Sequence, residues 1–371
     1  MNIAFLGQKS FDVGQQGGGI EKHVHELAPR LVRAGHHVLL YVRPHDLATR
    51  PRYWEGVRLV YLPTVYTKHL EAIIHVFLST LDVLFRPVDV IHYHGVGPAL
   101  LSWVPRLLKR HATVVVTFHA QDRLHQKWGS VARAVLHAGE WAACHVPHMT
   151  IAVSHGIQVL CRETYHTEAV FIPNGAEVAT VRTTSLIKRD GLKPNAYILF
   201  VGRLLPVKGV HHLIRAFRRV KTDKQLIIIG APAVNEEPYV AALKRDAEGD
   251  ARIRFLGFRP PEDLAEFYAH AYLYCQPSES EGLPLSVIEA MGFGTAVLVS
   301  DIPGNVEAIH HAGFTFANKD ADDLVLQLQH LIDHPEQVAH SAKAVKDTVR
   351  TFFHWDRITE HTIEVYRSAR H

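Results

Sequence analysis

The chain has 371 residues, of which 47% are hydrophobic and 21% are charged, and its net charge is +3 with histidines counted as neutral. This mixture is typical of a soluble globular protein and excludes a disordered or fibrous chain. The length predicts two domains. The small basic excess is not gathered into the stripe of a nucleic-acid-binding protein, so we expect no nucleic-acid partner.

Cysteine usage and hydropathy predict a cytoplasmic protein. Cys144, Cys161 and Cys275 lie far apart in the sequence and cannot form a disulfide framework. The chain opens directly on a strand-like run, without the layout of a secretory signal. The longest apolar stretch, 70–85, carries charged residues and is shorter than the ~20 apolar residues of a membrane span. We therefore interpret it as a buried or interfacial helix.

Short β-branched runs alternate with amphipathic stretches, which predicts parallel sheets with crossover helices. The expected strands of the first half are 3–6, 38–42, 57–62, 88–92, 113–118, 150–153 and 169–172. Those of the second half are 197–201, 225–229, 253–256, 271–275 and 296–300. Helices are expected to begin near Ile20, His69, Pro98, Ser130, Lys208, Pro238, Pro261 and Pro284.

Residues 178–194 lose this periodicity and read as an interdomain linker. The predicted domains are therefore 1–180 and 181–371, each a doubly wound α/β fold. Helical spacing returns at 355–371 and predicts a final helix, which could pack back on the first domain.

Ligands of open α/β sheets bind outside the carboxyl ends of the strands, so the residues after each strand are informative. The first strand is followed by glycines at 17–19, directly before a helix. Their N–H groups could approach a phosphate or sugar closely, and a flexible loop without a ligand is the alternative. There is no G-x-G-x-x-G fingerprint, and Arg43 rather than an acidic residue follows the second strand, which disfavours a nicotinamide dehydrogenase.

Histidines follow two further strands. His119 comes directly after the strand at 113–118, where a polar side chain would point into a crevice. His92 and His94 follow another strand and are interpreted as wall residues. The chain has 28 histidines without a metal-ligand spacing such as His-Glu-x-x-His, so their number predicts no metal site.

Two cations flank the turn after the first strand of the second half. Arg203 and Lys208 lie on either side of this turn, just before a helix. Guanidinium and ammonium groups there can reach one anion, and phosphate oxygens suit both. Two solvated surface cations are the alternative.

The segment 278–291 combines two carboxylates with a helix start. Pro284 suits the first helical turn, which places Glu281 in the preceding loop and Glu289 inside the helix. The two carboxylates could accept hydrogen bonds from hydroxyl groups, and a structural role for Glu289 is the alternative. Exposed N–H groups at the helix start predict an anion site, near Leu283, Leu285 and Ser286.

These motifs, taken in order, resemble those of the retaining, nucleotide-sugar-dependent glycosyltransferases of family 4. The matching runs are Gly-Gly-Gly-Ile-Glu at 17–21, Ile-Pro-Asn-Gly at 172–175, Gly-Arg-x4-Lys-Gly at 202–209 and Glu-x7-Glu at 281–289. Residues 294–300 resemble the family's Gly-x-Pro-Val-x-x-Ser, with Ala296 where proline is common. The resemblance implies the GT-B architecture, two facing Rossmann-like doubly wound domains with a cleft between them. Residues 1–180 would bind the acceptor, and 181–371 the donor.

The resemblance also implies roles for single residues of the second domain. Arg203 and Lys208 would bind the donor's diphosphate, together with backbone groups around 283–286. Glu281 would bind hydroxyls of the donor sugar, Glu289 the ribose of the nucleotide, and Phe258 would lie by the base.

In the first domain, Gly18 and Gly19 would face the phosphates and His119 would contact the transferring sugar. The family often has aspartate directly after this histidine, whereas here two residues intervene before Asp122.

The implied reaction moves a sugar from a nucleotide-diphosphate sugar, with a UDP- or GDP-sugar favoured, to a glycan or lipid-linked acceptor in surface polysaccharide or glycoconjugate synthesis. The acceptor would attack on the face that the leaving group departs from. No cofactor or metal is expected, because cations and helix N–H groups address the developing phosphate charge and no Asp-x-Asp ends an expected strand. The alternatives are a nucleotide-sugar 2-epimerase, a phosphorylase, or a non-catalytic sugar-nucleotide-binding subunit.

The first half also carries cations near apolar helices, which predicts peripheral contact with the inner face of an anionic membrane. These cations are Lys68, Arg106, Lys109 and Arg110. Ordinary solvated faces are the alternative.

Overall fold

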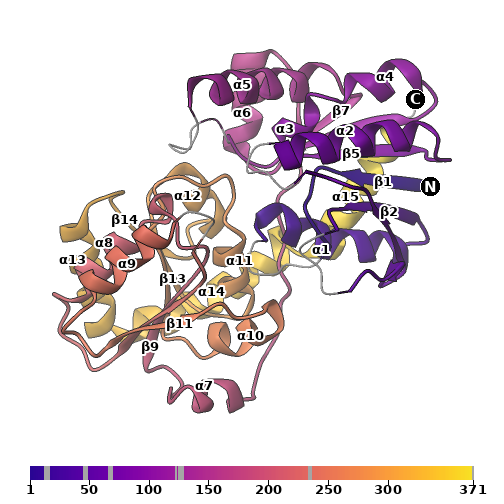
Figure 1. Ribbon diagram of the computed structural model, residues 1–371. Helices are drawn as coiled ribbons and strands as arrows, with labels where there is room; N and C mark the ends of the chain where they lie inside the picture. The colour runs from indigo at the N-terminus through magenta and orange to yellow at the C-terminus, as the bar shows by residue number, and fades with distance from the viewer. Residues whose placement is uncertain are drawn as a thin grey trace. The chain divides into compact units, whose positions relative to one another are not determined.

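The computed structural model describes residues 1–11, 17–44, 49–65, 70–121, 123, 129–232 and 236–369. These form two compact units (Figure 1). The chain passes from the first unit to the second between Asn174 and Gly175, whereas the sequence predicted this boundary between residues 180 and 181. It returns to the first unit at Trp355.

The first unit is built on an eight-stranded sheet in the order β3-β4-β2-β1-β5-β6-β7-β8. All neighbouring strands run parallel except β3 and β4, which form an antiparallel pair. The strands are β1 (Asn2–Leu6), β2 (His37–Val42), β3 (Tyr53–Trp54), β4 (Val57–Tyr61), β5 (Val90–His94), β6 (Thr113–Phe118), β7 (Met149–Ala152) and β8 (Val170–Phe171).

The second unit is built on a six-stranded parallel sheet in the order β11-β10-β9-β12-β13-β14. The strands are β9 (Tyr197–Val201), β10 (Gln225–Ile229), β11 (Ile253–Gly257), β12 (Leu273–Gln276), β13 (Val297–Ser300) and β14 (Phe314–Phe316). Numbered within the unit, this order is 3-2-1-4-5-6, that of a Rossmann fold.

Helices connect the strands in both units. Those of the first are α1 (Gly19–Arg33), α2 (Leu70–Leu84), α3 (Val96–Ala99), α4 (Trp103–Leu108), α5 (Ser130–His145), α6 (His155–Tyr165) and α15 (Trp355–Ser368). Those of the second are α7 (Ser185–Arg189), α8 (Val210–Phe217), α9 (Glu237–Asp246), α10 (Pro261–Ala269), α11 (Leu285–Gly292), α12 (Pro303–Ile309), α13 (Ala321–Asp333) and α14 (Pro335–Phe352).

The central strands are apolar runs because helices cover both faces of a parallel sheet. Every residue of β6 and of β9 is buried. This burial explains why short continuous runs of β-branched and aromatic residues located the strands in the sequence, without the polar alternation of a half-exposed sheet.

Several elements differ from the sequence prediction. The strands β3 and β14 are too short to give a pattern. The strand expected at 88–92 is β5, two residues later. The expected linker 178–194 contains α7, which buries Ile187. The helix expected from Pro98 is divided into α3 and α4, and the helix α8 begins at Val210 after a 3-10 turn, Pro206–Lys208. The helices α6, α12, α13 and α14 were not predicted.

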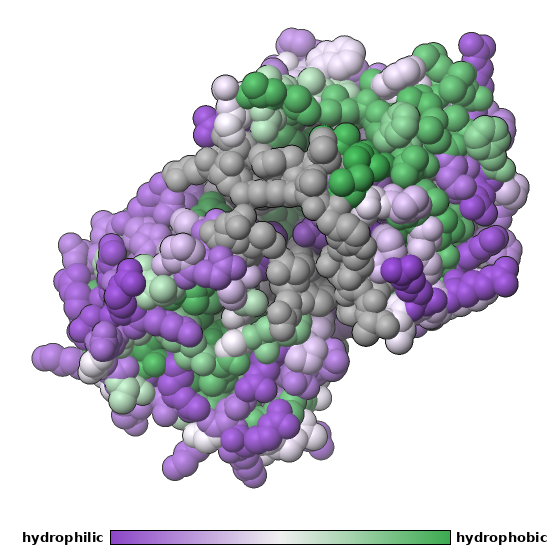
Figure 2. All heavy atoms as spheres, viewed as in Figure 1, coloured by the Kyte–Doolittle hydropathy of each residue, from purple (hydrophilic) through white to green (hydrophobic). Residues whose placement is uncertain are grey.

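The apolar helix α2 is buried on one side only. Val76 and Val83 are buried, whereas Ile73, Phe77 and Leu81, four residues apart along the helix, are exposed. Figure 2 shows the hydrophobic area over α2 and α4. Within the described ranges, no helix is both long and apolar enough to cross a membrane.

Candidate active site

The candidate site of the second unit lies where the connections of the sheet change direction. The strands β9 and β12 are neighbours, and the chain leaves β9 toward one edge of the sheet and β12 toward the other. The carboxyl ends at such a switch point form a crevice in Rossmann-like folds. The segments that follow these two strands carry Lys208 and Glu281.

Gly209 allows these two segments to meet. Its φ of +67° is left-handed, and a Cβ atom there would lie 1.9 Å from the carbonyl oxygen of Pro277. Any other residue would push the segments apart. The backbone N–H of Glu279 also donates to the carbonyl of Val207 at 2.8 Å. Lys208 is thereby held opposite the loop that carries Glu281.

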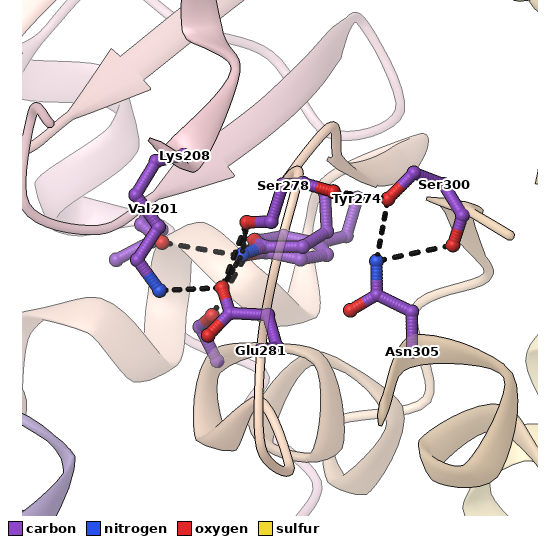
Figure 3. A network of polar contacts seen from close by, with 9 residues as sticks. Val201, Lys208, Tyr274, Ser278, Glu281, Ser300 and Asn305 are labelled. Carbon is purple, nitrogen blue, oxygen red and sulfur yellow. Dashed lines mark hydrogen bonds and ion pairs between the residues drawn. The ribbon is translucent and has the colours of Figure 1, made fainter. Parts of the chain in front are cut away.

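The carboxylate of Glu281 accepts three hydrogen bonds at one oxygen (Figure 3). Oε1 accepts from the ammonium of Lys208, from Ser278 Oγ at 2.7 Å and from Gln276 Nε2 at 3.0 Å. Within the described ranges, no residue donates to Oε2. One oxygen is thus fixed by the protein, and the other can accept a hydrogen bond from a ligand.

Further hydrogen bonds hold this carboxylate in place (Figure 3). Tyr274 OH donates to Gln276 Oε1 at 2.6 Å, and Gln276 Nε2 also donates to Ser278 Oγ at 2.7 Å. Ser300 Oγ donates to the carbonyl of Ser278, and Asn305 Nδ2 donates to Ser300 Oγ at 2.8 Å. A connected network of this kind orients a functional group before a ligand arrives.

The pKa of Glu281 lies below its ordinary value. Burial alone would raise this pKa, but the charge and hydrogen bond of Lys208, with the hydrogen bonds from Ser278 and Gln276, outweigh that effect. Glu281 is therefore an anion at neutral pH and serves as a hydrogen-bond acceptor only.

The other expected residues of the second unit follow strands of the same sheet or lie on the helix after β12. Arg203 follows β9, is exposed, and makes no hydrogen bond or ion pair with any described residue. Glu289 lies inside α11 and accepts a hydrogen bond from Tyr268 OH at 3.3 Å. Phe258 is half-buried directly after β11.

The helix α11 begins one residue later than expected, because Pro284 is its N-cap and not part of its first turn. The first backbone hydrogen bond of the helix is donated by Val287 N–H to the carbonyl of Pro284. The N–H groups of Leu285 and Ser286 therefore precede the helical bonding, as the anion-site prediction requires, whereas Leu283 is buried.

The glycine loop of the first unit is bound by its own helix. The carboxylate of Glu21 accepts hydrogen bonds from Lys9 N at 3.0 Å and from Gly18 N at 2.8 Å. The N–H of Gly18, expected to approach a phosphate, is therefore occupied, and Gly19 is the first residue of α1. Glu21 takes this place because the N-terminus of a helix favours a negative charge.

His119 belongs to a buried cluster of histidines in the first unit. Its Nε2 lies 3.4 Å from His94 Nδ1, and its ring packs edge-on against that of His23. His92 bonds Tyr366 OH at 2.6 Å and Thr117 Oγ1 at 2.7 Å. His92 and His94 are fully buried.

Burial keeps these histidines neutral. Desolvation lowers the pKa of His23 to about 4, partly offset by the hydrogen bond with Asn174. Desolvation, followed by repulsion from neighbouring histidines, puts the pKa values of His92, His94 and His119 well below the ordinary value. A neutral His119 can either donate or accept a hydrogen bond.

Sequence reasoning missed several residues that support the two sites. Gln276 and Ser278 follow β12, so their place at a strand end was a signal that could have identified them. His23 bonds Asn174 at 3.0 Å across 151 residues of sequence, and no local pattern encodes such a pair. Asp122 lies outside the described residues.

Comparison with known proteins agrees with this fold. The model of Glycosyltransferase Family 4 matches residues 17–180, and that of Glycosyl transferases group 1 matches 183–348. Glycogen synthase of Mycobacterium tuberculosis is 26% identical, over 95% of this chain and 92% of its own. Phosphatidyl-myo-inositol mannosyltransferase of Mycolicibacterium smegmatis is 27% identical, over 100% and 94%. The Anabaena HepE structure with UDP-glucose superposes with a TM-score of 0.81 at 20% identity, over 99% and 100%.

The two family models together span both units. The chain therefore belongs to the family 4 type of glycosyltransferases, with the GT-B architecture of two Rossmann-like domains.

The buried histidines predict that the first unit loses stability in mild acid. Because their pKa values are lowered in the folded state, the unfolded chain binds more protons between about pH 6.5 and pH 4. The free energy of unfolding should therefore fall as the pH drops from about 6.5, by up to about 1.4 kcal/mol per pH unit for each such histidine. Urea denaturation at several pH values measures this slope.

Tryptophan fluorescence reports on the first unit, because the four tryptophans of the described ranges belong to it: Trp54, Trp103, Trp141 and Trp355. The His23→Gln variant should have a shallower slope than the wild type. A free energy of unfolding that is constant between pH 7 and pH 5 would contradict the neutral assignment.

Proposed function

We propose that this glycosyltransferase moves a sugar from a nucleotide-diphosphate sugar to a glycan or lipid-linked acceptor, with retention of the anomeric configuration and without a metal ion. The observation that carries the proposal is the Lys208–Glu281 pair at the switch point of the second sheet, with the exposed Arg203 on the same turn. This arrangement combines cations for a diphosphate with a fixed carboxylate for sugar hydroxyls.

The donor half of the proposal is supported by the distribution of contacts on Glu281. Its Oε1 is held by the protein, so Oε2 can accept a hydrogen bond from a hydroxyl of the donor sugar. Among the described residues, Arg203 has no hydrogen-bond or ion-pair partner to give up before it binds phosphate oxygens. The complex of HepE with UDP-glucose favours a UDP-sugar, and a GDP-sugar is the second choice. We assign Glu289 to the ribose and Phe258 to the base.

Charge governs the proposed chemistry. When the bond between the anomeric carbon and the phosphate oxygen breaks, negative charge grows on the diphosphate. Arg203, Lys208 and the N–H groups at the start of α11 can stabilise that charge, which removes the need for a metal ion. The N–H groups of Leu283 and Gly18 are weaker candidates, because Leu283 is buried and Gly18 donates to Glu21.

Retention is proposed to follow from attack on the face that the diphosphate leaves. The acceptor hydroxyl forms the new bond to the anomeric carbon and gives its proton to the departing phosphate oxygen. The Lys208–Glu281 pair supports this route, since a carboxylate bonded to three donors is a poor nucleophile. We assign His119 and Gly19 of the first unit to contacts with the transferring sugar and its phosphates.

For the acceptor we propose a chemical class. The names of the two relatives describe synthesis of a polysaccharide and mannosylation of a phosphatidylinositol. We therefore expect a growing glycan or a lipid-linked sugar from surface polysaccharide or glycolipid synthesis.

The proposed reaction predicts a product of retained configuration. Purified protein incubated with UDP- or GDP-sugars should release the nucleoside diphosphate, slowly to water and faster with acceptor. Proton NMR of the glycoside should show the anomeric configuration of the donor. Added magnesium or manganese should not raise the rate of the EDTA-dialysed protein.

The same assay separates the alternatives. A 2-epimerase would convert the sugar nucleotide without acceptor, and a phosphorylase would require free phosphate. A product of opposite anomeric configuration, or a rate restored only by added magnesium or manganese, would contradict the mechanism.

The cations predict a loss of turnover without loss of folding. Arg203→Ala and Lys208→Ala should each lower kcat/KM by about 10²- to 10³-fold, the usual effect of removing one donor to a developing anion. Steady-state kinetics with the best donor measures this effect.

Arg219→Ala is the matched control. Arg219 is an exposed cation of the same unit whose ion pair with Asp322 should contribute little. Equal activity of Arg203→Ala and Arg219→Ala, with both proteins folded by circular dichroism, would refute the diphosphate role of Arg203.

We also propose that one face of the first unit lies against an anionic membrane. This face, the α2–α4 face, consists of the exposed apolar side chains of α2 and α4 and the next residues: Ile73, Phe77, Leu81, Phe85, Trp103, Leu107 and Leu108. α2 and α4 pack against each other, and Figure 2 shows a hydrophobic area over these two helices. Arg106 and Arg110 are exposed beside them.

One of the expected cations does not belong to this face. Lys109 is only 6% exposed, and its ammonium donates to the carbonyls of Leu84 and Arg86 at 2.9 and 2.7 Å. Its role is to bind the carbonyl groups at the end of α2. Lys68 lies outside the described residues.

The remaining cations predict a dependence on lipid charge. Each cation near an anionic surface contributes about 1 kcal/mol, so the double variant Arg106→Ala/Arg110→Ala should bind anionic vesicles roughly 30-fold more weakly. Co-sedimentation with phosphatidylcholine vesicles, with and without phosphatidylglycerol, measures the difference. The control is Arg219→Ala/Arg350→Ala, two exposed cations of the second unit. Binding that is insensitive to phosphatidylglycerol would contradict the assignment.

A further inference from the structure

A second group of ligating side chains lies beside the candidate active site, and the proposed reaction does not use it. The three side chains are His211 and His212, at the start of α8, and Glu279, after β12. One ligand atom from each lies within 4.8 Å of the other two. The side chains are 21%, 16% and 20% exposed, so an ion in solution can reach them.

Both histidines direct the same ring nitrogen at one carboxylate oxygen. His212 Nε2 lies 3.3 Å from Glu279 Oε1, and His211 Nε2 lies 3.9 Å from it. Ligands at about 2.0 to 2.2 Å from a tetrahedral zinc ion are about 3.4 Å apart. The His212–Glu279 pair already has this spacing, and His211 needs only a small rotation to reach it.

The outer contacts also fit a metal site. Tyr239 OH lies 3.0 Å from His211 Nδ1, and an Nδ1–H donated to it leaves the lone pair of Nε2 facing Glu279. Lys319 binds the other carboxylate oxygen, Glu279 Oε2, at 2.8 Å. Metal-bound imidazoles and carboxylates usually have second partners of this kind.

From this geometry we propose that His211, His212 and Glu279 form a binding site for a zinc-class divalent ion, with a fourth position open to water. Two imidazoles and one carboxylate are ligands of zinc, cobalt and nickel, whereas magnesium and calcium prefer oxygen ligands. The cluster of His23, His94 and His119 is a weaker candidate, because its three side chains are buried and an ion in solution reaches them less easily.

Such an ion would join the two segments that form the candidate active site. His211 lies three residues after Lys208, and Glu279 lies two residues before Glu281. Bound metal should therefore stabilise the contact between the turn at 206–209 and the loop at 277–281. The site stands on its own residues and does not depend on the proposed reaction.

Titration of the full-length, EDTA-treated protein with Zn²⁺ alone tests the site by calorimetry. We expect one Zn²⁺ per chain to bind more tightly than any further Zn²⁺. Co²⁺ should give the visible absorption of a four- or five-coordinate site, and Zn²⁺ should displace it. Mg²⁺ should not compete.

Variants separate this site from the other histidines. His212→Ala and Glu279→Gln should each abolish the tight ion and the Co²⁺ spectrum. The control His330→Ala/His334→Ala removes another close histidine pair of the same unit and should change neither. Tyr239→Phe should weaken binding by about 10- to 100-fold, the effect of losing an outer partner.

Two outcomes would overturn the proposal. The first is that the wild-type protein binds no Zn²⁺ tightly. The second is that wild type, His212→Ala and Glu279→Gln all bind zinc with the same stoichiometry and give the same Co²⁺ spectrum. Circular dichroism shows whether each variant is folded. If His212→Ala does not fold, Glu279→Gln still tests the site, because glutamine has nearly the same size as glutamate.

Discussion

The close approach of Gly209 to the carbonyl of Pro277 determines the geometry of the second unit's site. A left-handed residue without a side chain allows the turn after β9 to approach the loop after β12. Lys208 then reaches Glu281 on one side of this contact, and the two histidines of α8 reach Glu279 on the other. One backbone contact therefore positions both the proposed donor site and the proposed metal site.

Glu281 shows how a half-buried carboxylate can be kept charged and available to a ligand. Burial alone would favour its neutral form, so the protein supplies an ammonium, a hydroxyl and an amide, all to one oxygen. The resulting carboxylate is rigid and charged, and among the described residues none donates to its other oxygen. This division explains why the same residue can hold Lys208 in place and recognise a ligand.

The sequence predicted most strands and the placement of Glu281 and Glu289, because buried parallel strands and strand-to-helix turns have local patterns. It could not predict contacts that depend on the folded chain. The Lys109 side chain, which looked like a surface cation, binds carbonyls at the end of α2. Gly18 looked free, but Glu21 occupies its N–H. The pairing of His23 with Asn174 and the convergence of His211 and His212 on Glu279 likewise require distant segments to meet.

The helix α15 has a consequence for the order in which the chain can fold. Its residues Trp355 and Tyr366 are buried in the first unit, where Tyr366 bonds His92, yet the ribosome makes them after the entire second unit. While about 180 further residues are synthesised, the amino-terminal sheet therefore lacks the helix that covers part of its core. During that time His92 also lacks its hydrogen-bond partner, the phenol of Tyr366. A chaperone that shields this surface during translation would act on the first unit rather than on the second.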